Sequence, residues 1–137
     1  MNTMKIAGFN FTKILAEKNN SNFEGLKIDS GINLESIEKI NSKEIKSSDS
    51  FLIIKWSCEI NYAPNIANIS FSGNLVLSLE EKKAKEIISS WENKKLDQEF
   101  NMNVLNLILK KVNIKAVQLE DELNLPLHFK LPSLKSK

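Results

Sequence analysis

Two neighbouring segments decide the fold, FLIIKWSCEINY at residues 51–62 and IANISFSGNLVLSL at residues 66–79. In both, apolar and polar side chains alternate with a period of two. This pattern is typical of strands that bury one face of an antiparallel sheet. The apolar positions are Leu52, Ile54, Trp56, Cys58, Ile60, Tyr62, Ala67, Ile69, Phe71, Gly73, Leu75, Leu77 and Leu79. Pro64 and Asn65 provide turn residues between the segments, so we expect a hairpin.

Two more strands are predicted upstream of this hairpin. The segment at 26–35 has one apolar face, formed by Leu26, Ile28, Ile32 and Leu34. The segment KIAGFNFTKIL at 5–15 is apolar on both faces, through Ile6, Phe9, Phe11, Ile14 and Leu15. We therefore expect this strand to be central in the sheet or to be covered by a partner. The polar stretch at 41–50 is predicted to be a loop.

From Glu80 onward the apolar residues recur with a period near 3.6, which indicates helices. Ser78 and Glu81 match a capping box at the start of the first helix. Its apolar stripe comprises Ala84, Ile87, Ile88 and Trp91, and Glu81 and Lys85 are spaced for an ion pair. Asp97 can cap the next helix, whose apolar residues from Phe100 to Val112 cover more than one face. The pattern resumes from 114 to 119 and stops before Pro126.

These segments predict one domain over residues 1–137, of the α+β class. A four-stranded, meander-like antiparallel sheet at about 5–79 is followed by two or three helices at about 80–123, packed on one face of the sheet. A short tail follows at 124–137. A chain of 137 residues can bury a proper core without disulfides or metals.

The composition excludes several functional classes. All 19 basic residues are lysines and the net charge is only +2, so arginine-based phosphate or guanine recognition is excluded and nucleic-acid binding is not the first expectation. A single cysteine cannot form an internal disulfide. The chain shows neither a signal-peptide pattern nor an apolar stretch long enough to span a membrane, so we expect a cytoplasmic protein.

Candidate catalytic residues have simpler structural interpretations. His128 lies in a proline-flanked tail and is interpreted as a surface or partly packed residue. Cys58 lies on an apolar strand face and is expected to be an inert buried thiol. The run Glu120 to Glu122 is interpreted as a solvated face, and the four glycines form no phosphate-binding loop. We therefore expect a protein that is not an enzyme, with no metal site and no cofactor.

The remaining feature is a surplus of apolar residues on the first strand and on the second helix. Such a surplus indicates a subunit interface, a ligand groove, or both. Candidate interface residues are Phe9, Phe11, Leu105, Ile108 and Leu109.

The order of these elements resembles SecB, the protein-export chaperone family, over nearly the whole chain. The residues that carry the resemblance are the strand pair FLIIKWSCEINY and IANISFSGNLVLSL, and the tail segment ELNLPLHF. The resemblance implies a homo-oligomer, a dimer or a tetramer built from two dimers. It also implies that unfolded or precursor proteins are held in apolar grooves without nucleotide. The aromatic positions place such a client groove near Trp56, Tyr62, Phe71 and Trp91.

The resemblance leaves the client open. The family includes export chaperones and chaperones dedicated to an antitoxin. Export members present an acidic surface to the SecA motor, whereas this chain is slightly basic and ends in Lys130, Lys135 and Lys137. That departure argues against docking to SecA. Two other hypotheses remain, an oligomeric adaptor whose apolar surplus is consumed by self-assembly, and a nucleic-acid module that uses the lysines of the helices.

Overall fold

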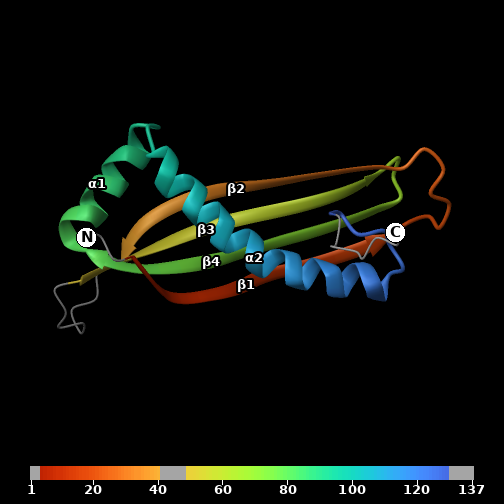
Figure 1. Cartoon of the computed structure of the whole chain (residues 1–137), viewed down its shortest axis with the longest axis horizontal. Coiled ribbons are helices and arrows are strands. Elements are labelled where there is room, and N and C mark those ends of the chain that lie inside the picture. The colour runs from red at the N-terminus through yellow and green to blue at the C-terminus, as the bar shows by residue number, and fades with distance from the viewer. Residues whose placement is uncertain (1–3, 41–48, 130–137) are drawn as a thin grey trace, which may run out of the picture.

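The computed structural model describes residues 4–40 and 49–129 (Figure 1). Their elements are β1 (Lys5–Lys18), β2 (Lys27–Ile40), β3 (Asp49–Ala63), β4 (Ala67–Glu80), α1 (Glu81–Glu92) and α2 (Gln98–Glu122). All strand pairs are antiparallel. The four-stranded antiparallel sheet followed by two helices confirms the predicted α+β class. Most of the predicted loop, at 41–48, and the lysines beyond Phe129 lie outside the described residues.

The order of the strands is β1-β4-β3-β2. Strands β2, β3 and β4 follow one another as expected, but β1 pairs with β4, so the predicted meander is wrong for the first strand. The connection at 19–26 therefore passes the ends of β4 and β3, where the amides of Asn19 and Asn20 donate to the carbonyl oxygen of Ile66. Alternation of side chains specifies the faces of a strand, but it does not specify its neighbours.

Strand β1 lies at an edge of the sheet, and its apolar residues share one face. Its register with β4 shifts between Ile6 and Gly8 and again between Phe11 and Lys13. Each shift adds an unpaired residue, which reverses the alternation that follows. As a result Ile6, Phe9, Phe11 and Ile14 pair with Leu77, Leu75, Gly73 and Phe71. All four partners lie on the buried face of β4, so the interpretation of β1 as apolar on both faces is wrong, and only Leu15 points the other way.

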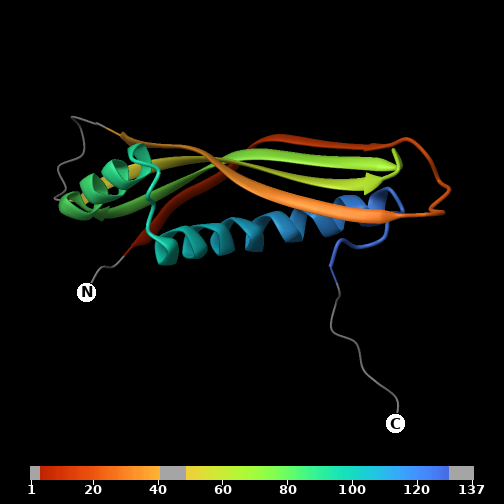
Figure 2. The same ribbon diagram turned by 90° about the horizontal axis from the view of Figure 1, so that it is seen from above.

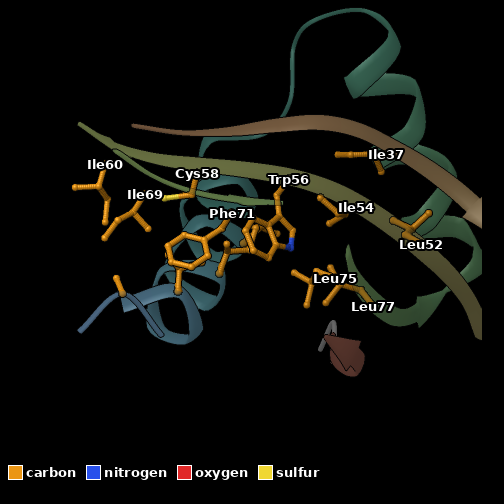
Figure 3. Packing of buried hydrophobic residues seen from close by; sticks show 14 of the residues in the cluster. Ile37, Leu52, Ile54, Trp56, Cys58, Ile60, Ile69, Phe71, Leu75 and Leu77 are labelled. Carbon is orange, nitrogen blue, oxygen red and sulfur yellow. The ribbon is translucent and has the colours of Figure 1, made fainter. Parts of the chain in front are cut away.

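Both helices pack on one side of the sheet (Figure 2). Helix α2 buries a row of residues spaced by four, and the central strands bury every second residue against it. Figure 3 shows part of this core, which extends along the sheet from Ile60 and Ile69 to Leu52 and Leu77. The buried row of α2 is Phe100, Val104, Ile108, Val112, Ala116 and Glu120.

The helix ends follow the expected chemistry only in part. Asp97 caps α2, because its carboxylate accepts the amide of Phe100 at 3.1 Å. The predicted capping box at α1 is wrong, because Ser78 is still in β4 and the N-cap is Glu80, which makes no side-chain cap bond. The predicted pair of Lys85 with Glu81 is present at 3.8 Å, and Lys39 of β2 also reaches Glu81 at 3.2 Å.

Candidate functional site

The helix-covered face of the sheet is the candidate binding surface. Helix α2 crosses this face obliquely, from the side of β2 toward β1, while α1 packs at one end (Figure 1). A single helix laid obliquely cannot cover four strands of 14 or 15 residues. Apolar side chains of the two edge strands are therefore left partly uncovered on either side of α2.

The partly covered apolar residues come from both edge strands and from α2 itself. Ile6 and Ile14 of β1 are 50% and 44% exposed. Met102 and Ile114 of α2 are 50% and 61% exposed, but each lies midway between two members of the buried row of α2 and therefore points away from the sheet. Half-buried apolar residues that pack against the core on the helix-covered face of the sheet are Phe9, Phe11, Leu26, Ile28, Ile32 and Leu34. Together the side chains of the two edge strands and Leu26 form an apolar margin along both flanks of α2, which we call the flank surface.

Three of the four aromatic residues predicted to line a client groove are core residues. Trp56, Tyr62 and Phe71 are each only 1% exposed, because strand alternation places them on the face under α2. They therefore offer a client no surface in this structure, which differs from the prediction. Trp91 at the end of α1 is partly exposed and lines an open pocket of about 640 Å³ with Leu96 and Asn101.

The interface candidates are distributed between the core and the flank surface. Phe9 stacks on the buried indole of Trp56, with ring centroids 5.4 Å apart, and Phe11 meets the same indole edge-on. Leu105 and Leu109 are half-buried on α2. Ile108 is fully buried against the sheet by its own chain, so its side chain has no surface left for a second copy.

A buried polar cluster at the end of α2 was missed by the sequence analysis. Glu120 is completely buried, which contradicts its interpretation as part of a solvated acidic run. Its carboxylate accepts the Tyr62 hydroxyl of β3, and it accepts the backbone amide of His128 at 2.9 Å. The signal was present, because Glu120 continues the four-residue spacing of the buried α2 row through Ala116.

His128 packs into this cluster through both ring nitrogens. Its Nδ1 lies 3.0 Å from both carboxylate oxygens of Glu120, and its Nε2 lies 2.8 Å from Oδ1 of Asn113. The side chain is 8% exposed, so His128 is packed more deeply than the surface or partly packed residue that was expected. This histidine joins the segment after α2 to the helix.

The shifted pKa values in the structure indicate stable protonation states. Burial raises the pKa of the Tyr62 phenol, and the hydrogen bond to Glu120 raises it further, so Tyr62 remains a donor. Burial likewise raises the pKa of the Cys58 thiol, which disfavours the reactive thiolate. The hydrogen bond from Lys39 lowers the pKa of the exposed Glu81 carboxyl.

The opposite face of the sheet is polar around Ser57 and Ser72 and carries apolar side chains at Phe51, Ile53 and Val76. Two adjoining hollows of about 440 and 460 Å³ share Ser57 and Ser72. The charged side chains that line them are Lys13, Lys55, Asp29, Glu35 and Glu59. Because both signs are mixed, the described residues that line these hollows form neither a basic track for phosphates nor an acidic docking patch.

No group of three or more His, Cys, Asp or Glu side chains in residues 4–40 and 49–129 could hold a metal ion. Neither helix within those ranges is long and apolar enough to cross a membrane.

No protein-family model matches the chain, and no curated protein matches it. Among solved structures, it is similar to a SecB-like chaperone of Mycobacterium tuberculosis in complex with a ChAD peptide from an antitoxin. That match has a TM-score of 0.55 and 11% identity and covers 96% of this chain and 88% of the other. A protein of unknown function from Streptococcus agalactiae matches with a TM-score of 0.56 and 12% identity, over 97% and 99% of the two chains. The chain thus has the fold of a SecB-like chaperone.

Proposed function

We propose that the chain, residues 1–137, acts as one domain and is an ATP-independent chaperone that binds apolar segments of unfolded client proteins. The observation that carries this proposal is the flank surface, where apolar side chains of β1 and β2 stay partly exposed on either side of one helix. An extended apolar peptide beside α2 would cover them and remove that area from water.

The clients are proposed to be proteins rather than small molecules or nucleic acids. The similar chaperone from M. tuberculosis was solved with a peptide from an antitoxin, which supports a peptide as the bound species. The mixed charges on the polar face and the net charge of +2 favour a dedicated client over docking to the SecA motor. We propose a cytoplasmic, non-catalytic role that needs no nucleotide or metal.

The proposal is tested by light scattering from a chemically unfolded client that is diluted into buffer with and without this protein. We expect suppression of aggregation at a near-stoichiometric ratio without nucleotide. Unchanged scattering across several clients would contradict the proposal.

Two neighbouring residues of β1 provide a matched pair of variants for the same assay. Ile14 lies on the flank surface, whereas Leu15 faces the polar side. Ile14→Ser should raise the ratio of chaperone to client needed for suppression severalfold, because it removes apolar contact area. Leu15→Ser should change that ratio little. Equal effects would mean that clients do not bind along the flank surface.

A second candidate function is an oligomeric adaptor whose apolar surface is used only for self-assembly. It is favoured by the half-buried Leu105 and Leu109, which lie on α2 next to exposed Met102. This function predicts a stable oligomer that binds little of an environment-sensitive dye such as ANS. The chaperone function predicts dye binding that an apolar peptide displaces.

A further inference from the structure

Residues 123–129, which follow α2, are held against the body of the protein by one buried side chain and several hydrogen bonds. Leu125 is 7% exposed, and its amide donates to the carbonyl oxygen of Glu120 at 2.8 Å. The carbonyl oxygen of Pro126 lies 3.2 Å from the Tyr62 hydroxyl of β3. Lys18 of β1 reaches the carbonyl oxygen of Leu123 at 2.8 Å. Residues 123–129, which we call the strap, therefore occupy the sheet surface beside the end of α2.

The strap is held in the manner of a bound peptide. One apolar side chain, Leu125, enters the core, and the contacts that follow it are made mainly to Glu120. Leu127 is only partly covered, and Phe129 is exposed. None of the residues 123–129 belongs to a strand of the sheet. The buried carboxylate of Glu120 accepts a backbone amide and contacts the ring nitrogen of a histidine, and the Tyr62 phenol lies next to a backbone carbonyl oxygen.

A carboxylate at this position is costly unless its partners are present. Glu120 is fully buried, and the nearest cationic group that contacts it is the imidazole of His128 when protonated. An apolar residue would complete the row of α2 at lower cost, since the five positions before it are all apolar. The carboxylate therefore makes this position selective for segments that can hydrogen-bond to it, whereas an apolar residue would only fill the space.

We propose that Glu120 and Tyr62 form a peptide-anchoring site, which the strap fills within its own chain and which a client segment of similar chemistry takes over. The matching client segment is extended and apolar, with a Leu-Pro pair followed two residues after the proline by a histidine or another cationic side chain. This inference rests on the proposed chaperone function and adds to the flank surface a second, selective subsite.

The test uses the full-length protein and a fluorescein-labelled peptide of residues 123–129, LNLPLHF. His128→Ala removes the ring contacts to Glu120 and Asn113 from the strap but leaves the anchor intact. Fluorescence anisotropy should show that the labelled peptide binds His128→Ala about tenfold more tightly than the natural chain, because the internal competitor has lost charge-assisted bonds.

Matched carboxylates test the anchor itself. Adding Glu120→Gln to His128→Ala should abolish the gain in peptide affinity, whereas adding Glu122→Gln, at an exposed position of the same acidic run, should preserve it. A labelled peptide whose histidine is replaced by alanine should bind His128→Ala no more tightly than it binds the natural chain. Equal affinity for the natural chain and His128→Ala, or equal effects of the two glutamine substitutions, would overturn the proposal.

A second measurement does not depend on any variant. Hydrogen exchange of the natural chain should show protected backbone amides at Leu125 and His128. A saturating concentration of unlabelled peptide should displace the strap and so remove the protection of these two amides. Unchanged protection under saturation would overturn the proposal. Aggregation suppression is measured on the same samples. If client aggregation is suppressed but the strap amides stay protected, only the anchoring site is rejected. If client aggregation is not suppressed, the chaperone function is rejected.

Discussion

Gly73 lies directly under the indole of Trp56, on the helix-covered face of β4. A Cβ atom at this position would lie 2.3 Å from the backbone oxygen of Asn10 and 2.5 Å from Cζ2 of Trp56. The large ring is therefore accommodated by the absence of a side chain on the neighbouring strand. Phe9 then stacks on the same indole, which makes Gly73 the base of an aromatic cluster.

At this residue scale, we predict that Gly73→Ala destabilises the protein by about 2 kcal/mol, because the added methyl group forces the indole and β1 to shift. Gly31→Ala is the control, since a Cβ at Gly31 meets no atom within 4 Å. Urea unfolding followed by tryptophan fluorescence measures both. A similar loss of stability in the two variants would contradict the packing of Trp56 over Gly73.

At the scale of elements, β1 shows how two bulges convert an irregular sequence pattern into a one-sided strand. Thr12 is the extra residue between Phe11, which pairs with Gly73, and Lys13, which pairs with Ser72. Without Thr12 these two pairs would follow one another in regular alternation. The bulge can thus be removed without changing the face of any other residue in the strand.

We therefore predict that deletion of Thr12 leaves the protein folded, with a midpoint of urea unfolding close to that of the natural chain. Deletion of Leu15, in a regular part of the same strand, should be far more damaging. It would send the inward residues on one side of the deletion to the wrong face. Circular dichroism and urea unfolding compare the two. A folded Leu15 deletion together with an unfolded Thr12 deletion would show that the register is misassigned.

At the scale of the whole molecule, the two faces of the sheet have opposite character. One is polar and of mixed charge around Ser57 and Ser72, and the other is apolar and only partly covered by α2. In the proposed function, self-association and client binding both use the apolar face, so the two activities are expected to compete for it. The polar face remains available to water in either case.

We predict that the protein self-associates and that Leu109→Ser on α2 shifts its mass toward the single-chain value of 15.6 kDa. Lys110→Ser, on the next residue and exposed, should leave the mass unchanged. Multi-angle light scattering over a range of concentrations measures this, and urea unfolding confirms that both variants fold. A natural chain that stays at the single-chain mass at every concentration would contradict the prediction.

The candidate site shows most clearly what the sequence reveals and what it does not. Alternation identified Trp56, Tyr62 and Phe71 as facing inward, but their large rings suggested a groove, and the oblique path of α2 buries them instead. The strap was visible only as a proline-containing segment. Its anchor Glu120 was interpreted as solvated because carboxylates are rarely buried, although its spacing from Ala116 pointed inward.

The class of fold, the inward faces of β3 and β4 and the cap at Asp97 followed from the sequence alone. These features depend on the periodicity of a strand or helix and on hydrogen bonds between residues close in the chain. Only the tertiary structure decided that β1 pairs with β4, that its bulges turn Ile14 inward, and that His128 and Tyr62 enclose Glu120. Each of these depends on contacts between residues distant in the sequence, and local periodicity carries no information about which distant partner a residue meets.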